Sequence, residues 1–307
     1  MDLQGCGTAL VTPFRADGSI DERALYDLAR WQVESGIDWL LACGTTAETP
    51  TLDEQEWIQV IRIVSEAAAG RVPVWAGCTH NATRQAVARA RAAAQIPGVT
   101  AILSANPYYN KPTQEGQYEH FKAVASAAKL PVVLYNIPSR SGANLEPSTV
   151  LRLIDAAPNI AGVKESSGNL VQITELVTRA PRSFRVYSGD DMMALGTLGV
   201  GGAGLISVAS NLIPGEIAQM VHAALAGDWA AARRINRKYF RLMQGLFKET
   251  SPGPVKAILA MMGKIGENYR LPMLPVAPAT HTFLEKLAGE LGLLVHGPQP
   301  EGDLRMY

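Results

Sequence analysis

The sequence predicts an α/β fold, a (β/α)8 TIM barrel followed by a C-terminal helical extension. Two observations lead to this prediction. Short runs of β-branched and aliphatic residues recur along the chain, and longer alanine-rich amphipathic stretches separate them. Strands that alternate with helices must pair in parallel, and eight such units close naturally into a barrel. The length of 307 residues suits such a barrel, because this fold commonly exceeds roughly 200 residues as one domain.

Eight runs of the sequence are candidate strands. Each is short, apolar and bounded by turn residues, and the runs cover residues 7–14, 38–44, 72–77, 99–105, 131–136, 160–165, 184–190 and 203–210. Several helical patterns between them open with Asp, Asn or Thr, which cap helix N-termini. The stretch from Thr51 to Glu54 also has the spacing of a capping box.

A doubly wound open sheet is the competing fold. A dinucleotide-binding glycine pattern after the first strand would favour it, but the only match, G-x-G-x-x-G at residues 199–204, precedes a strand-like run. Its glycines therefore cannot place helical N–H groups around a pyrophosphate, and we interpret them as a tight loop entering the eighth strand.

The alternation of strands and helices stops near residue 214, and helical patterns alone follow. We therefore predict two parts, a catalytic barrel at 1–227 and a C-terminal helical region at 228–307. The second part should contain three helices and a short tail at 296–307.

Charge and cysteine content exclude several classes of function. Lys plus Arg and Asp plus Glu number 28 each, so no overall field attracts nucleic acid or an anionic membrane. Cys6, Cys43 and Cys78 have no metal-ligand spacing, and we expect buried, reduced thiols and no metal. Because the sequence shows neither a secretory signal nor a long apolar span, we expect a cytoplasmic protein.

Lys164 is the first candidate for chemistry, because it ends the short apolar run IAGV. The other eight lysines fall in loops or amphipathic helices, where we expect their amines to reach water. The C-terminal ends of barrel strands face the active site, and burial there lowers the pKa of an amine. A neutral amine attacks a ketone to form a Schiff base. Strand position alone also allows a structural lysine paired with Glu165 or another carboxylate.

Polar residues follow the other strand ends. The second strand leads into Gly44-Thr45-Thr46, the fourth into residues 106–110, and the fifth into residues 135–142. The threonine pair suits a small carboxylate, tyrosine hydroxyls relay protons, and Arg140 offers two donors to a second carboxylate. We expect these groups to converge on one site.

These motifs resemble the dihydrodipicolinate synthase family of pyruvate-dependent class I aldolases. The resemblance spans nearly the whole chain and is carried by GTTAE, NPYYNKP, YNIPSRSG, GVKESSG, YSGDD, GAGLISV, SPGPVK and RLPMLP. It implies a lyase that condenses pyruvate with L-aspartate 4-semialdehyde to 4-hydroxy-tetrahydrodipicolinate, in the diaminopimelate route of lysine biosynthesis. It also implies that no metal or organic cofactor is needed, and that the protein is a homo-oligomer, a tetramer built from tight dimers.

The resemblance also implies roles for individual residues. Lys164 corresponds to the Schiff-base lysine, and Tyr135 to the general acid/base. Through the Thr45 hydroxyl, Tyr135 would be linked to Tyr109, which in this family reaches across a dimer interface. The remaining binding residues are Thr46, which with Thr45 holds the pyruvate carboxylate, Arg140, which binds the semialdehyde carboxylate, and Gly189 and Ile206, whose backbone lines the pocket.

Three other functions compete with this interpretation. Sibling aldolases that act on N-acetylneuraminate or on a 2-keto-3-deoxy sugar acid share the lysine, the threonine loop and the tyrosine. Arg140 and the NPYYN stretch favour the synthase. A catalytically inactive barrel with a binding role would show a damaged set of residues, and a pyridoxal-phosphate enzyme would absorb visible light.

The sequence departs from the family pattern at three places. Ala47 stands where glycine is usual, which restrains the threonine loop but leaves its hydroxyls intact, and Ser251 replaces a common asparagine. The lysine-feedback pocket usually carries histidines and a glutamate, and the corresponding positions here are Glu54, Trp57 and Gln85, with Asn81 and Tyr108 retained. We therefore expect L-lysine to inhibit weakly or not at all.

Overall fold

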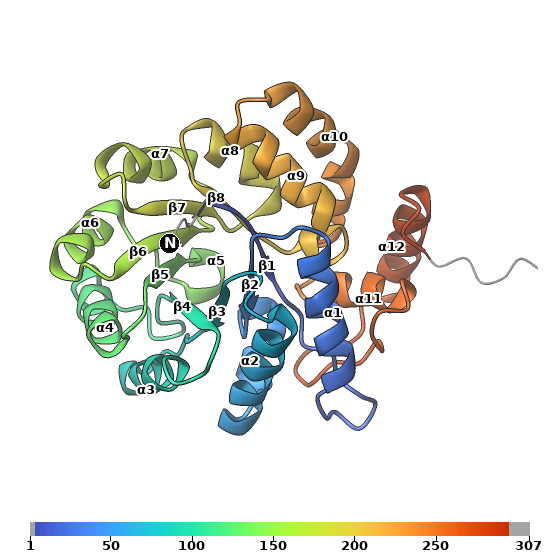
Figure 1. The fold of residues 1–307 in the computed structure, drawn as a ribbon, viewed down its shortest axis with the longest axis horizontal. Helices are drawn as coiled ribbons and strands as arrows, with labels where there is room; N and C mark the ends of the chain where they lie inside the picture. The colour runs from blue at the N-terminus through green and yellow to red at the C-terminus, as the bar shows by residue number, and fades with distance from the viewer. Residues whose placement is uncertain (1–3, 295–307) are drawn as a thin grey trace, which may run out of the picture.

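The computed structural model describes residues 4–294 and shows a closed barrel of eight parallel strands in chain order (Figure 1). Strand β8 pairs with β1 and closes the barrel. The predicted TIM barrel is confirmed, and an open sheet is wrong. The strands are β1 Gly5–Ala9, β2 Trp39–Ala42, β3 Val74–Gly77, β4 Val99–Ala105, β5 Val132–Asn136, β6 Ile160–Glu165, β7 Arg185–Ser188 and β8 Gly204–Ser207.

Several strands are shorter than the apolar runs that predicted them. Residues 10–14 follow β1 without being part of a strand of the barrel, and residues 208–210 lie in and just before the 3₁₀ helix η4 (Ala209–Asn211). All of these residues are buried, because the loops fold over the barrel end. An apolar run in this sequence therefore indicates buried residues, and only some of the residues in each run pair as a strand.

Helices surround the barrel on its outside (Figure 1). They are α1 Glu22–Glu34, α2 Glu54–Ala68, α3 Thr83–Ala93, α4 Gln114–Ala127, α6 Pro147–Ala156, α7 Leu170–Arg179, α8 Ala194–Gly199 and α9 Pro214–Leu225. The short helix α5 Pro138–Ser141 lies instead over the end of the barrel, near the centre of the view.

The capping box of α2 lies two residues beyond the predicted one. The Asp53 side chain accepts from the backbone N–H of Glu56, and the Glu56 carboxylate accepts from the backbone N–H of Asp53. Thr51 is instead the last residue of the 3₁₀ helix η2 (Thr49–Thr51), so the prediction from Thr51 to Glu54 is wrong. The glycine pattern at 199–204 does connect α8 to β8, with Gly201 at φ +99°, as predicted.

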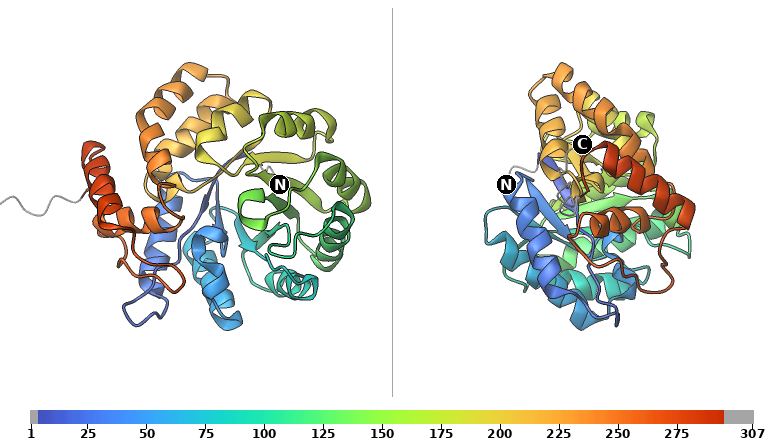
Figure 2. Two further views of the ribbon diagram at one scale, coloured as in Figure 1. Left: turned by 180° about the vertical axis from the view of Figure 1, so that it is seen from behind. Right: turned by 90° about the vertical axis from the view of Figure 1, so that its right-hand side faces the viewer.

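Three helices follow the barrel, as predicted: α10 Trp229–Gly245, α11 Gly253–Met261 and α12 Pro278–Glu290. Figure 2 shows α11 and α12 on the side of the barrel beside α1. The ammonium of Lys264, just after α11, lies 3.7 Å from the ring centroid of Trp31 in α1. The expected tail at 296–307 lies outside the described residues, and the division at residue 227 stays a prediction.

Aromatic side chains fill the barrel interior. The rings of Trp39 and Trp75 stack with centroids 4.8 Å apart, and Tyr187 meets both edge-on. Gly162 leaves room for this cluster, because a Cβ there would lie 2.5 Å from the Arg185 carbonyl oxygen and 3.2 Å from the Tyr187 ring. The interior is therefore a packed core that keeps water from entering through the barrel.

The thiols of Cys6, Cys43 and Cys78 are free and buried, as predicted. Within residues 4–294, no helix combines the length and apolar character that crossing a bilayer requires.

Candidate active site

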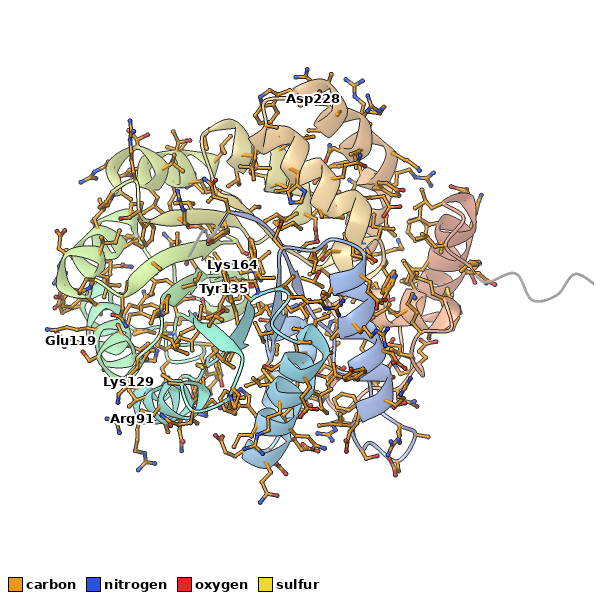
Figure 3. The ribbon with its side chains drawn as sticks, viewed as in Figure 1. Arg91, Glu119, Lys129, Tyr135, Lys164 and Asp228 are labelled. Atoms are coloured by element: carbon orange, nitrogen blue, oxygen red, sulfur yellow. The ribbon has the colours of Figure 1, made fainter. Side chains whose placement is uncertain are left out.

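Lys164 lies inside the barrel near its mouth, the end formed by the C-termini of the strands. The strand register places it between Tyr135 of β5 and Tyr187 of β7. Its ammonium lies 4.4 Å from the Tyr135 ring centroid, and only 4% of the residue is exposed. Figure 3 shows the two side chains together at the centre of the molecule. The structure thus brings together the two residues predicted for the central chemistry.

Glu165 does not pair with Lys164, because successive side chains of a strand point to opposite faces. Its carboxylate accepts instead from Asn136 Nδ2 at 3.1 Å, from Gln172 Nε2 at 2.8 Å and from the Ser167 N–H at 2.7 Å. Among residues 4–294, no carboxylate lies within ion-pair distance of Lys164. The alternative of a structural lysine paired with Glu165 is therefore wrong.

Burial lowers the pKa of Lys164 to about 8. The buried carboxylate of Asp191 opposes this change, and the positive charge of Arg140 adds to it. Asp191 itself is held by the Ser207 hydroxyl and by the N–H groups of Val208 and Ala209. With this pKa, roughly a tenth of the Lys164 amines are neutral and nucleophilic at pH 7.

Gly189, immediately after β7, provides the space that the Lys164 side chain occupies. A Cβ at this position would lie 2.0 Å from Ser166 Oγ and 2.8 Å from Lys164 Cε. Any side chain at residue 189 would therefore displace the Lys164 side chain. Ile206, the other predicted pocket residue, is fully buried in the interior cluster.

Tyr135 is a buried phenol at the same end of the barrel. Burial raises its pKa, and the hydroxyls of Ser166 and Thr45 and the charge of Arg140 act in the opposite direction. Its hydroxyl is therefore protonated at neutral pH and faces Ser166 and Thr45. A protonated phenol next to a nucleophilic amine is suited to deliver and recover protons.

Thr45 and Thr46 belong to the 3₁₀ helix η1 (Thr45–Ala47) after β2. The Ala47 N–H donates to the Gly44 carbonyl at 3.1 Å, and the Ala47 carbonyl accepts from the Thr12 hydroxyl at 2.8 Å. The residues with positive φ between β2 and α2 are Cys43, at +56°, and Glu48, at +53°. Ala47 has an ordinary backbone conformation, so alanine in place of glycine introduces no strain there.

Arg140 lies at the end of α5 and is exposed at the mouth. Its Nη2 donates to the carbonyl oxygen of Ser251 at 3.0 Å. Because this contact uses the main chain of residue 251, serine in place of asparagine leaves the acceptor unchanged. The rest of the guanidinium remains available to a carboxylate.

Tyr109 is not brought to the other site residues within this chain. It is 86% exposed and has φ +74°, an uncommon backbone conformation for tyrosine.

A cavity of about 280 Å³ lies at the mouth, and its walls include Thr45, Tyr108 and Arg140. Lys164 and Tyr135 are not in the wall of this cavity, whereas Thr45, whose hydroxyl influences the pKa of Tyr135, is part of the wall.

Sequence reasoning missed Lys256, which was expected to reach water. Its side chain is fully buried, and its ammonium lies 2.5 Å from Glu48 Oε1. The signal was present in the apolar stretch VKAILAMM, which gives α11 a buried surface on almost every side. The role of Asp191 was also missed, although the motif YSGDD contains it.

No group of three or more His, Cys, Asp and Glu side chains that could hold a metal ion occurs among residues 4–294. The ionisable groups near Lys164 are instead Tyr135, Arg140 and Asp191, with the hydroxyls of Thr45 and Ser166. This set can form a Schiff base, move protons and bind carboxylates.

Comparison with known proteins identifies the family. The model of the dihydrodipicolinate synthetase family matches residues 2–290. The chain belongs to this family. A 4-hydroxy-tetrahydrodipicolinate synthase from Acidobacterium capsulatum is 74% identical over 98% of this chain and 100% of its own length. The predicted family and enzyme class, a lyase, are thereby confirmed.

Solved structures of the family have the same fold. The dihydrodipicolinate synthase from Aquifex aeolicus superposes with a TM-score of 0.94 at 40% identity, covering 96% of this chain and all of that chain. The chloride-inhibited enzyme from Acinetobacter baumannii, solved in complex with pyruvate, has a TM-score of 0.93 at 39% identity and covers 95% of this chain and all of that one.

Proposed function

We propose that this chain forms a Schiff base between Lys164 and pyruvate and adds the resulting enamine to L-aspartate 4-semialdehyde. As a member of its family the chain is a carbon–carbon lyase of lysine and diaminopimelate biosynthesis, with the activity of a 4-hydroxy-tetrahydrodipicolinate synthase. The single observation that carries the proposed chemistry is the buried Lys164 amine, whose pKa is lowered to about 8 and which has no carboxylate partner among the described residues.

The first half of the reaction prepares the nucleophile. The neutral Lys164 amine attacks the ketone carbon of pyruvate, and water leaves as the imine forms. Thr45 and Thr46 hold the pyruvate carboxylate beside the amine. The protonated imine withdraws electrons from the methyl carbon, which loses a proton and becomes an enamine. Tyr135 moves these protons, because its ring lies beside the amine and its hydroxyl faces Thr45.

The second half forms the ring. The enamine carbon attacks the aldehyde carbon of the semialdehyde, whose oxygen takes a proton from Tyr135 and becomes a hydroxyl. The amine of the semialdehyde then attacks the imine carbon and displaces Lys164, which closes the six-membered ring. Arg140 binds the carboxylate of this second substrate at the mouth, within reach of solvent.

The role of Tyr109 belongs to an oligomer in this proposal. An exposed aromatic ring in a strained backbone conformation is unexpected on a free surface, and a neighbouring subunit would give it a partner. We propose a homotetramer of tight dimers in which Tyr109 enters the partner's site. Light scattering gives the oligomeric state. Tyr109→Phe should lower kcat while the oligomer is kept, and a Tyr109→Phe variant with unchanged kcat would contradict the role.

We further propose that the reaction needs no metal or organic cofactor and takes place in the cytoplasm. The imine supplies the electron withdrawal that a Lewis acid would otherwise provide. Activity should therefore persist after dialysis against EDTA, and the purified protein should have no visible absorbance band. Loss of activity that added metal restores would contradict this proposal.

A coupled assay tests the function directly. The purified chain is given pyruvate and L-aspartate 4-semialdehyde, and the reduction of the cyclic product by added reductase is followed. Turnover is expected. Cleavage of N-acetylneuraminate or of a 2-keto-3-deoxy sugar acid, without turnover of the semialdehyde, would favour a sibling aldolase. Absence of all turnover and of pyruvate trapping on Lys164 would favour an inactive barrel.

Regulation by L-lysine is predicted to be weak or absent. Trp57 is fully buried and its indole N–H donates to the Gly77 carbonyl, so its side chain is not accessible to a ligand. The Arg89 guanidinium lies over the Trp57 ring, lines the mouth cavity and already occupies the Glu54 carboxylate at 3.7 Å, so this carboxylate is not free for a second cation. A titration with L-lysine in the coupled assay should leave the rate unchanged, and inhibition at millimolar or lower concentration would contradict the prediction.

A further inference from the structure

Lys256 and Glu48 form a fully buried ion pair between the C-terminal helices and the barrel mouth. The Lys256 ammonium lies 2.5 Å from Glu48 Oε1, and the two side chains are 0% and 1% exposed. The ammonium also lies 4.5 Å from the ring centroid of Phe14 and 4.9 Å from that of Tyr269. The other carboxylate oxygen of Glu48 accepts from the backbone N–H of Arg270 at 3.3 Å. Both oxygens are therefore held by the C-terminal region.

Glu48 occupies the junction of the two 3₁₀ helices that form the threonine loop. Its φ of +53° and ψ of +33° are left-handed, a conformation that costs a residue with a side chain about 1–2 kcal/mol. Its N–H donates to the Thr45 carbonyl at 3.2 Å, and its carbonyl accepts from the Thr51 N–H at 2.9 Å. A change in the backbone of Glu48 would therefore move Thr45 directly.

The strain at Glu48 needs a compensating interaction, because other backbone conformations are of lower energy. Residue 48 is neither glycine nor asparagine, the residues that adopt the left-handed geometry most readily. Within residues 4–294, only the side chain of Glu48 fixes the residue from outside the loop, through Lys256 and the Arg270 N–H. A buried ion pair adds little net stability by itself, but it fixes two segments in one relative position.

We propose that Lys256 is a positioning residue for the pyruvate-binding loop. Lys256 holds Glu48 in its left-handed conformation and thereby orients the hydroxyls of Thr45 and Thr46. This inference rests on the proposed function of the threonine loop. The C-terminal helices, which contribute no group to the chemistry, thus act on the binding of the first substrate. Lys256 itself remains outside the reaction, since its ammonium is enclosed by Phe14, Tyr269 and Glu48.

Three variants and one control test the proposal. Lys256→Met removes the charge at similar length, and Glu48→Met/Lys256→Met removes both buried charges and so keeps the interior neutral. Glu48→Gln keeps the size of the side chain and one acceptor for Lys256. Lys264→Met is the matched control, because this lysine lies in the same region and stacks on Trp31 without touching the loop. Circular dichroism first establishes which variants are folded.

The measured quantity is the pyruvate concentration at which half of the protein is trapped by borohydride, together with KM for each substrate in the coupled assay. We expect Lys256→Met and the double variant to raise the half-trapping concentration and the KM for pyruvate at least about 10-fold, because small displacements of binding groups have effects of this size. Glu48→Gln should give a smaller increase. The KM for the semialdehyde and all values of Lys264→Met should stay within about 2-fold of the wild type.

A folded double variant with wild-type pyruvate binding would overturn the proposal, since the pair would then serve stability alone. If Lys256→Met does not fold, the double variant and Glu48→Gln decide the question. A wild-type half-trapping concentration and a wild-type KM for pyruvate in both variants would also contradict the proposal. Failure of wild-type protein and Lys264→Met to trap pyruvate would instead contradict the proposed function itself.

Discussion

The barrel mouth and the contact between α11 and the barrel each contain a buried lysine, and the two lysines have opposite environments. Lys164 lies beside the Tyr135 ring, with no carboxylate in ion-pair distance among residues 4–294, and its pKa falls to about 8. Lys256 is also fully buried, and burial lowers its pKa too, but Glu48 lies 2.5 Å from its ammonium and opposes this change.

Burial alone therefore does not produce a nucleophilic amine. Desolvation disfavours the ammonium at both sites, and the partner decides whether the amine keeps its proton. A carboxylate in contact fixes Lys256 and opposes the loss of its proton, whereas Lys164 has only the more distant Asp191 to oppose that loss. This contrast between the two lysines leads to four predictions, in decreasing order of size.

Lys164→Ala should lower kcat in the coupled assay by at least about 10³-fold, because no other amine takes over the Schiff base. Lys256→Met should keep most of kcat at saturating pyruvate, since its effect falls on binding. Rates are measured with both substrates saturating. Comparable losses of kcat in two folded variants would remove the distinction between the lysines.

Replacing the two lysines by methionine should change the free energy of unfolding in opposite directions. Lys256→Met leaves Glu48 buried without its partner and should lower the free energy of unfolding by about 3–5 kcal/mol. Lys164→Met removes an unpaired buried amine and should raise it, by at most about 3 kcal/mol at pH 7. Urea unfolding monitored by fluorescence measures both, and a destabilised Lys164→Met variant would contradict the comparison.

The sign of the effect at Lys164 is set by proton binding. The folded pKa of Lys164, about 8, lies below the value of 10.5 for a free lysine, so the unfolded chain binds the extra proton between these pH values. The free energy of unfolding of the wild type should therefore rise as pH increases from about 8 toward 10.5. Below pH 8 the full destabilisation caused by burying the Lys164 ammonium is present. Lys164→Met should lack this dependence.

Arg140 offers a way to shift the reactivity of Lys164 without touching it. Removing its charge should raise the pKa of Lys164, because a neighbouring cation disfavours the ammonium. In Arg140→Met, the rise of the pyruvate-trapping rate with pH should move to higher pH, and the rate at pH 7 should fall by less than about 10-fold. Arg179→Met, on the outer helix α7, is the control. An unshifted profile would exclude Arg140 as an influence on the amine.

The ion pair of His222 with Asp38 provides an exposed case for the same comparison. The two side chains are 49% and 30% exposed, Nε2 lies 2.7 Å from Oδ2, and the hydrogen bond to Asp38 raises the pKa of His222. The contribution of this ion pair to the free energy of unfolding should be fully present below about pH 6.5, and it should disappear as pH rises through the raised pKa of His222 in the folded protein. His222→Gln should cost about 1 kcal/mol or less at pH 5.5 and nothing at pH 8.5. Thermal unfolding at both pH values measures this, and an equal loss at both would contradict it.

The fold could be predicted from sequence because the alternation of strand and helix patterns is a local signal repeated eight times. The unpaired burial of Lys164 could be anticipated for a related reason, since a charged residue at the end of an apolar strand conflicts with its surroundings. Strand ends were predicted too long, because buried loop residues such as those at 208–210 resemble paired ones in the sequence.

The environment of Lys256 could not be predicted in the same way. Its partner, Glu48, is 208 residues away in the chain, and neither residue conflicts with its local pattern strongly enough to identify the pair. Tyr109 shows a different limit, because the sequence and the single chain both leave its partner undefined. Contacts made between distant segments or between subunits depend on the assembled fold, which local patterns do not encode.

The amine that pyruvate modifies can be located in a single experiment. The wild-type protein is incubated with pyruvate and borohydride, digested, and analysed by mass spectrometry, so that all nine lysines are compared at once. We predict one reduced pyruvate adduct, on Lys164, with Lys256 unmodified. An adduct on any other lysine, or none at all on a folded protein, would contradict the assignment of the reaction to an unpaired buried amine at the barrel mouth.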